Sequence, residues 1–262
     1  AVEARGPGSQ HLQQPVAPRR GAEQADVADV RAIGQHAEVG SIRREMMEEV
    51  GYRADKLILV ANGYVSPGSS SERIFLYYAP DDDPALNARK CDLVAQVGAN
   101  CAAHGLHFLM EPLVYDRALP PGSPDFARAK PALVRRAVEV FADPRFQVGT
   151  LKIEVPVDLA HVAGFGAPLM PREAALQAFR DVVAPARGLP VVFLSAGVPF
   201  DWFEASLSMA VESGAGFAGF MCGRSIWSDA VGVFGAGGEG SMRDWLADTG
   251  LARLQRLIAA VA

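Results

Sequence analysis

Lys152 lies in the middle of a short apolar stretch, Thr150-Leu151-Lys152-Ile153-Glu154-Val155, which is typical of a buried β-strand. Alternate side chains of a strand point to opposite faces, so Lys152 shares a face with Glu154, opposite Leu151 and Ile153. Burying an ammonium group is costly unless it is paired or neutral. Desolvation can lower the pKa of a lysine to about 7–8, which makes the amine a nucleophile for a carbonyl group. The alternative is a structural ion pair.

Glu111 closes a second apolar stretch, His107-Phe108-Leu109-Met110-Glu111. If the two stretches are neighbouring parallel strands, Glu111 is level with Lys152. A carboxyl group there can transfer protons to and from a substrate bound at the lysine. Glu111 can instead be a purely structural partner of the lysine, and Glu154 is a second group that can tune it from the same face.

Two glycine-containing turns follow two later apolar stretches. One is Ser195-Ala196-Gly197, and the other is Cys222-Gly223-Arg224-Ser225, just before a helix expected to begin near Ile226. Glycine lets backbone N–H groups approach an anion, and arginine adds a charged contact. Ser195, Gly197, Gly223 and Arg224 are therefore candidate phosphate-binding residues. The alternative is a pair of ordinary turns.

Strands and helices must alternate to bring these residues together. Apolar strand-like stretches occur at 74–78, 107–111, 150–155, 190–197 and 216–223, and amphipathic helical patterns occur at 86–104, 124–142, 172–183 and 200–213, with shorter helices after 223. This order predicts βα units and a parallel sheet buried on both faces. Five such units in residues 74–262 predict an α/β fold, a partial (β/α)8 TIM barrel made of about its last five units. In such barrels the functional site lies at the carboxyl ends of the strands.

Four stretches resemble the tagatose-1,6-bisphosphate aldolase family: HFLMEPLVYD (107–116), LKIEVPVD (151–158), FLSAGV (193–198) and GFMCGRSIW (219–227). The resemblance implies a class I aldolase without a cofactor. Lys152 would form a Schiff base, Glu111 would be the acid/base, and Arg224 with the glycine turns would bind phosphate.

The implied reaction is cleavage of a ketose 1,6-bisphosphate to dihydroxyacetone phosphate and an aldehyde phosphate. The family also includes aldolases for sulfofructose 1-phosphate, so the chemical identity of the substrate's second anionic group stays open. Arg73 stands where the family has a lysine before the first of these strands, and it keeps a positive charge there. The family's first three strands have no counterpart, so an inactive, truncated or fused remnant is an alternative.

A different resemblance covers residues 41–73. The stretch Arg44-Glu45-Met46-Met47-Glu48-Glu49-Val50-Gly51-Tyr52 resembles the core of the Nudix hydrolase box, in which glutamates hold a divalent metal against a diphosphate. Glu45, Glu48 and Glu49 are therefore weak metal-ligand candidates of a nucleotide-sugar pyrophosphatase. The Nudix box opens with a Gly and a Glu, and the matching positions here hold Val30 and His36 instead. The alternative is therefore an exposed acidic helix that binds no metal.

Composition limits the other possibilities. A formal net charge of −5 argues against nucleic acid as a partner. Three cysteines without metal-ligand spacing predict a reducing, cytoplasmic environment. No apolar run is long enough to cross a membrane, and no signal peptide is visible. We expect residues 1–40 to be a poorly ordered leader, 41–73 a Nudix-like fragment and 74–262 the partial barrel, with a small phosphorylated sugar as substrate and homo-oligomerisation at the open edge.

Overall fold

The computed structural model describes the backbone of residues 71–262 and the side chains from residue 76 onward. The expected leader and the metal-ligand candidates Glu45, Glu48 and Glu49 lie outside the described residues. The strands are β1 (Ser71–Tyr78), β2 (His107–Val114), β3 (Thr150–Glu154), β4 (Val191–Leu194) and β5 (Gly219–Met221). The helices are α2 (Pro84–Ala103), α3 (Pro124–Phe141), α4 (Arg172–Val183), α5 (Phe200–Glu212), α6 (Arg224–Trp245) and α7 (Leu251–Val261).

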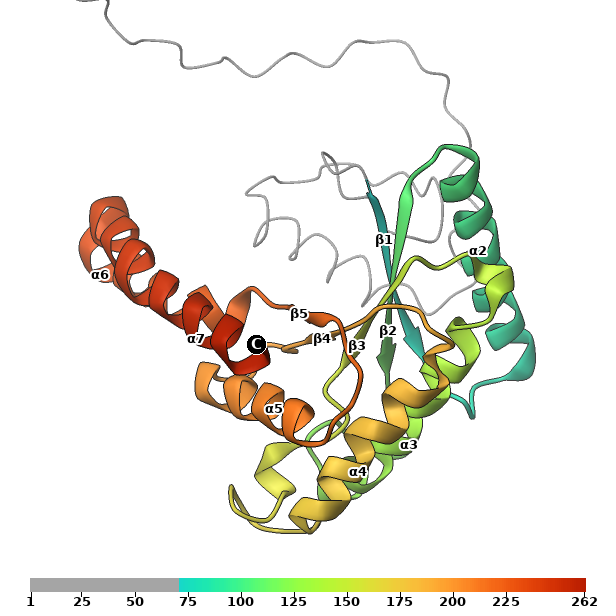
Figure 1. The fold of residues 1–262 in the computed structure, drawn as a ribbon, viewed down its shortest axis with the longest axis horizontal. Helices are drawn as coiled ribbons and strands as arrows, with labels where there is room; N and C mark the ends of the chain where they lie inside the picture. The colour runs from blue at the N-terminus through green and yellow to red at the C-terminus, as the bar shows by residue number, and fades with distance from the viewer. Residues whose placement is uncertain (1–70) are drawn as a thin grey trace, which may run out of the picture. The chain divides into compact units, whose positions relative to one another are not determined.

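The five strands form one parallel sheet in chain order, β1-β2-β3-β4-β5 (Figure 1). Met110 on β2 pairs with Leu151 on β3, and Lys152 pairs with Val192 on β4. Parallel neighbours need a crossover connection, and here each crossover between strands carries a helix. The predicted α/β fold with a partial barrel is confirmed.

The hydrophobic core lies between the sheet and the helices that cover one of its faces. Leu151 and Ile153 on β3 are fully buried there, as are Phe179 on α4 and Phe203 on α5. Figure 1 shows α2, α3 and α4 side by side along this covered face. The alternation of strand side chains therefore sends Lys152 to the opposite face of the sheet, as the sequence pattern predicts.

The later elements differ in extent from the sequence prediction. The strands β4 and β5 are shorter than the apolar stretches that predicted them. After β4 the chain turns at once, because Ala196 and Gly197 adopt positive φ angles. The helix α6 begins at Arg224 rather than near Ile226 and runs to Trp245 across a kink at Gly238, whose φ is 73°. The backbone at Gly238 is not helical, so α6 consists of two shorter helices joined at a kink, in line with the shorter helices predicted after residue 223.

Within residues 71–262, no helix is both long and apolar enough to cross a membrane.

Candidate active site

Lys152 and Glu111 form a buried ion pair on the face of the sheet opposite α2, α3 and α4. The Nζ of Lys152 donates to Oε2 of Glu111 at 2.9 Å, and the two residues are 9% and 8% exposed. The register of β2 and β3 brings them level, because Leu109 pairs with Thr150 and Met110 with Leu151. A buried amine beside a carboxylate can pass a proton directly to it.

Glu154, two residues beyond Lys152 on β3, has partners on β2 and α3. Its Oε2 accepts from the backbone N–H of Val114 at 2.8 Å, and its Oε1 lies 3.4 Å from Nζ of Lys130 on α3. These contacts tie the carboxyl ends of β2 and β3 to α3. The alternative in which Glu154 tunes Lys152 from the same face stays a prediction.

The turn after β4 is tight and left-handed. Ala196 and Gly197 have φ angles of 51° and 75°, and the N–H of Val198 donates to the carbonyl of Ser195 at 3.1 Å. Ser195 is buried at 7% exposure. This geometry turns the chain sharply from the end of β4 into α5.

Arg224, the first residue of α6, lies against that turn. A Cβ added at Gly197 would be 3.3 Å from Cζ of Arg224, so the guanidinium packs on the glycine. Ser225, only 2% exposed, donates from its hydroxyl to the carbonyl of Val198 and fastens α6 to the turn. This role of Ser225 is not predictable from the sequence, because nothing in its local pattern shows that its hydroxyl connects two loops.

The start of α6 is suited to hold an anion. Gly223 precedes it, and the structure shows no side-chain hydrogen bond capping the first turn of this helix. Its N–H groups carry the positive end of the helix dipole. The structure thus brings Ser195, Gly197, Gly223 and Arg224 to one edge of the sheet, at the ends of β4 and β5.

Cys222 lies near Lys152 but is not a nucleophile at neutral pH. Burial raises the pKa of its thiol to about 11, even though the nearby charge of Lys152 lowers it. The thiol is therefore protonated at physiological pH.

A further cluster, not predicted from the sequence, lies at the ends of β1 and β2. The side chain of Asp82 is fully buried and accepts from Nζ of Lys90 at 2.8 Å and from Nε of Arg117 at 2.8 Å. The hydroxyl of Tyr115 also donates to Asp82. Burial acts to raise the pKa of Asp82, but these hydrogen bonds hold it below its ordinary value. We call Asp82, Lys90, Tyr115 and Arg117 the β1–β2 cluster.

Arg73 lies in β1, where its backbone pairs with Leu109 of β2. Its side chain is outside the described residues, so its predicted positive charge at the site stays a prediction.

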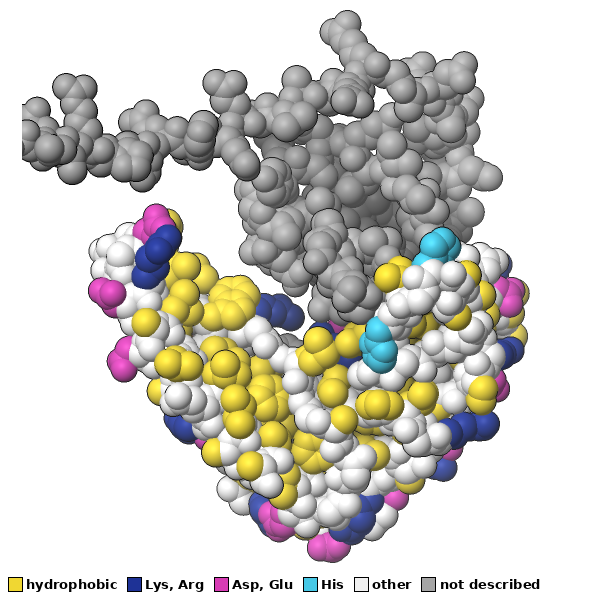
Figure 2. Space-filling model, turned by 45° about the horizontal axis from the view of Figure 1, so that its top comes forward, with side chains coloured by type: hydrophobic (Ala, Val, Ile, Leu, Met, Phe, Trp, Pro, Cys, Tyr) yellow, Lys and Arg dark blue, Asp and Glu magenta, His cyan; other side chains and the backbone are white. Residues whose placement is uncertain are grey.

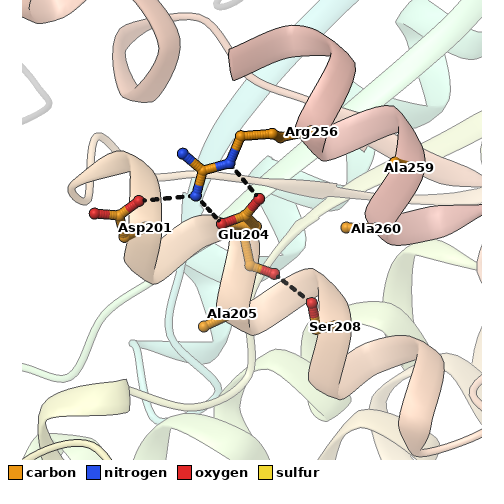
Figure 3. A pocket seen from close by; sticks show the side chains of 7 residues that line it. All are labelled: Asp201, Glu204, Ala205, Ser208, Arg256, Ala259 and Ala260. Carbon is orange, nitrogen blue, oxygen red and sulfur yellow. Dashed lines mark hydrogen bonds and ion pairs between the residues drawn. The ribbon is translucent and has the colours of Figure 1, made fainter. Parts of the chain in front are cut away.

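A separate surface cavity of about 390 Å³ lies between α5 and α7. Figure 3 shows Arg256 of α7 reaching over to Asp201 and Glu204 of α5. Three alanines and Ser208 line the rest of the cavity, and neither Lys152 nor Glu111 borders it. We interpret these ion pairs as contacts that hold α7 against α5 and not as a reaction site.

Among the described residues, no group of three or more His, Cys, Asp or Glu side chains is arranged to hold a metal ion.

Residues 54–229 match the model of the DeoC/LacD family aldolases. The range begins inside the stretch 41–73 that resembles the Nudix box. Tagatose 1,6-diphosphate aldolase of Staphylococcus aureus strain JH9 is 40% identical over 193 residues, which are 72% of this chain and 59% of the relative. The same protein of strain Newman gives the same values. This chain therefore spans about three fifths of the length of these relatives.

Solved structures with the same fold include fructose-bisphosphate aldolase from Plasmodium falciparum, at a TM-score of 0.53 and 16% identity over 73% of this chain and 56% of that one. An archaeal fructose-1,6-bisphosphate aldolase, solved with its catalytic lysine bound to a carbinolamine intermediate, matches at a TM-score of 0.47 and 16% identity over 79% of this chain and 67% of that one. At these identities the likeness concerns the fold alone.

Proposed function

Because this chain belongs to the DeoC/LacD aldolase family, we propose that it is a class I aldolase that cleaves a ketose 1,6-bisphosphate through a Schiff base on Lys152. The observation that carries the proposal is the buried pair of Lys152 and Glu111, with its 2.9 Å contact on the face of the sheet opposite α2, α3 and α4. The 40% identity to tagatose 1,6-diphosphate aldolase supports a tagatose-like substrate.

The first chemical step is formation of the imine. Glu111 takes a proton from the ammonium of Lys152, and the free amine attacks the C2 carbonyl of the ketose. A C–N bond forms, the carbonyl electron pair moves to oxygen, and that oxygen takes a proton from the nitrogen. Glu111 then returns its proton to the hydroxyl, which leaves as water from the carbinolamine and gives an iminium.

Cleavage of the carbon–carbon bond follows. The carboxylate of Glu111 takes the proton of the C4 hydroxyl, the C3–C4 bond breaks, and its electrons move into the iminium to form an enamine. The aldehyde phosphate is released. Protonation of C3 and hydrolysis of the imine by water then give dihydroxyacetone phosphate and restore Lys152.

The edge formed by β4 and β5 supports binding of the phosphate on C1. Arg224 offers a guanidinium, and the turn at Ser195–Gly197 and the start of α6 offer backbone N–H groups. Lys152 pairs with Val192 on β4. The turn at Ser195–Gly197 therefore follows the strand next to Lys152 and lies beyond the lysine in the direction of the carboxyl ends of the strands.

Borohydride trapping with dihydroxyacetone phosphate tests the proposal. Reduction of the imine should leave a stable adduct, which intact mass detects and peptide mapping places on Lys152. Lys152→Ala should abolish the adduct and lower cleavage by at least about a hundredfold, since the nucleophile is lost. Lys130→Met is the matched control, because Lys130 is also partly buried and paired with a glutamate but lies on α3.

An adduct that persists in Lys152→Ala, or a folded parent protein that gives no adduct, would contradict the proposal. The second outcome favours the inactive remnant. A hydrolysis of nucleotide sugars that needs Mg²⁺ would favour the Nudix alternative instead.

A further inference from the structure

The backbone pairing of β2 with β3 ends before it reaches the level of Glu111 and Lys152. β1 and β2 stay paired to their last residues, and β3 stays paired with β4 as far as Glu154. Between β2 and β3 the last paired residues are Met110 and Leu151. The ladder of paired residues therefore stops one position short of Glu111 and Lys152.

Pro112 accounts for this early end. The N–H groups along a strand point to its two neighbours in turn, so positions 110, 112 and 114 of β2 face the same neighbour. Val114 donates to Glu154 of β3, so that neighbour is β3. Proline has no N–H and cannot donate to a ladder. Pro112 therefore removes the donor that would continue the pairing, and Val114 supplies the next one toward β3.

The side chain of Glu154 takes up that donor. Its Oε2 accepts from the N–H of Val114 at 2.8 Å, and the side chain is only 13% exposed, so water competes little for this hydrogen bond. β2 and β3 are thus attached at two levels, by the last ladder pair and by the bond from Val114 to Glu154. Glu111 and Lys152 lie between these attachments, and their 2.9 Å contact depends on how far apart the strands stand there.

We propose that Glu154 is a positioning residue for the reaction. Its hydrogen bond with Val114 sets the separation of β2 and β3 at their carboxyl ends and so holds Glu111 in contact with Lys152. This inference rests on the proposed function, since a proton passes directly between the two groups only at hydrogen-bond distance. Glu154 acts through β2 and does not touch the substrate.

Two variants separate the reach of Glu154 from its charge. Glu154→Gln loses the charge but keeps an oxygen that accepts from Val114 at the same arm length. Glu154→Asp keeps the charge but shortens the arm by one methylene group, which withdraws the oxygen from Val114. Positioning predicts that Glu154→Gln behaves like the parent protein and Glu154→Asp does not. A direct effect of the charge on Lys152 predicts the reverse.

Nuclear magnetic resonance reads the contact without requiring catalysis. The chain has four lysines, so lysine enriched with ¹³C at Cε gives four signals, and the one that Lys152→Ala removes belongs to Lys152. Glu111→Gln should shift this signal, because the carboxylate beside the ammonium is lost. We expect Glu154→Asp to shift it in the same direction and Glu154→Gln to leave it in place. When Glu111→Gln is already present, Glu154→Asp should add no further shift, since it acts through Glu111.

Glu139→Asp is the matched control, because Glu139 is a partly exposed glutamate of α3 whose partners are two arginines of the same helix. It should leave the signal of Lys152 in place. A shift of this signal in Glu154→Gln, the absence of a shift in Glu154→Asp, or an effect of Glu154→Asp that persists beside Glu111→Gln would each overturn the inference.

The rate of imine formation separates this inference from the proposed function. Borohydride trapping with dihydroxyacetone phosphate should be at least about tenfold slower in Glu154→Asp and close to the parent rate in Glu154→Gln. Hexitol 1-phosphate, which has no carbonyl group, should bind equally to both variants in calorimetry, because the proposed phosphate contacts follow β4 and β5.

A parent protein that gives the expected shifts but no adduct would remove the aldolase reaction and leave the positioning of Glu111. An adduct on Lys152 that forms at the parent rate in Glu154→Asp would remove the positioning role and leave the aldolase reaction.

Discussion

Two lysine–glutamate pairs lie near each other, and their positions separate a reactive pair from a structural one. Lys130 projects from α3 and meets Glu154 at 3.4 Å, where Glu154 also holds the backbone of Val114. Lys152 projects from a strand onto the face opposite α2, α3 and α4 and meets Glu111 at 2.9 Å. Lys152 lies in the middle of the sheet, beside the strand that leads to the turn at Ser195–Gly197, which is why we propose the chemistry for Lys152 and not for Lys130.

At Cys222 the structure predicts low reactivity towards alkylating agents. Burial raises the thiol pKa to about 11, so the thiolate fraction grows about tenfold with each pH unit up to that value. We expect the rate of modification by iodoacetamide to keep rising through pH 10, as followed by peptide mass spectrometry. In the unfolded chain the same rate should level off near pH 9, close to the ordinary pKa. A folded protein with a plateau near pH 8.5 would contradict this.

Gly197→Ala should weaken the anion site. Its φ of 75° is unfavourable for alanine by about 1 kcal/mol, and the new Cβ would stand 3.3 Å from Cζ of Arg224. We expect hexitol 1-phosphate to bind roughly tenfold more weakly in calorimetry, because the guanidinium must shift. Gly216→Ala is the control, since a Cβ there meets nothing within 4 Å. Equal affinities in both variants would speak against this role of the turn.

At the scale of elements, the sequence predicted what depends on local pattern. Alternation of apolar residues placed Lys152 on the face opposite Leu151 and Ile153, and the order of strands and helices predicted the parallel sheet. We expected Glu111 to lie level with Lys152 because their strands were expected to be neighbours. The register of β2 and β3 confirms this position.

Contacts between loops could not be predicted in this way. Asp82 meets Tyr115 and Arg117 across 33 and 35 residues, and Ser225 meets Val198 across 27. Each depends on where two turns end in space, which periodicity does not encode. A run of three aspartates at 81–83 was visible in the sequence, but nothing in it distinguished the buried Asp82 from its exposed neighbours.

The packing of α2 gives a stability prediction for an element. A Cβ added at Gly98 would lie 1.9 Å from the carbonyl oxygen of Phe146, so the helix approaches this backbone more closely than any side chain allows. Gly98→Ala should lower the free energy of unfolding by about 3 kcal/mol or more, because the helix must move away. Urea denaturation measures this change in the free energy of unfolding.

Gly232→Ala on α6 is the matched control, since Gly232 is exposed and a Cβ there meets nothing within 4 Å. It should raise the free energy of unfolding by about 0.5–1 kcal/mol through helix propensity. If Gly98→Ala is as stable as Gly232→Ala, α2 does not depend on this close contact.

At the scale of the whole described part, exposed apolar side chains gather on the last two helices. Figure 2 shows hydrophobic side chains on the left of the view, where α6 lies. Trp227, Val231 and Phe234 on α6 and Leu251, Leu254 and Ile258 on α7 are all more than a third exposed. Within residues 71–262 the sheet also ends at β1 and β5 without closing. Exposed apolar surfaces and open sheet edges both favour association between copies of a chain. Homo-oligomerisation therefore stays a prediction.

The β1–β2 cluster should make the stability of the described part depend on acid. Its hydrogen bonds hold the pKa of Asp82 below its ordinary value despite burial. Because the pKa in the folded state is lower than the value of about 3.9 in the unfolded chain, the stabilisation is fully present above pH 5 and is lost as the pH falls below about 4.

Asp82→Asn should remove this dependence. At pH 7 it leaves Lys90 and Arg117 without their carboxylate, and we expect the free energy of unfolding to fall by about 3 kcal/mol. The difference from the parent protein should shrink as Asp82 itself becomes protonated, which urea titrations at pH 7, 5 and 3 would follow. Asp125→Asn is the control, because Asp125 is 71% exposed beside Arg128 and should cost under about 1 kcal/mol. A deficit in Asp82→Asn that stays constant from pH 7 to pH 3 would mean that the cluster stabilises the fold through packing and not through the charge of Asp82.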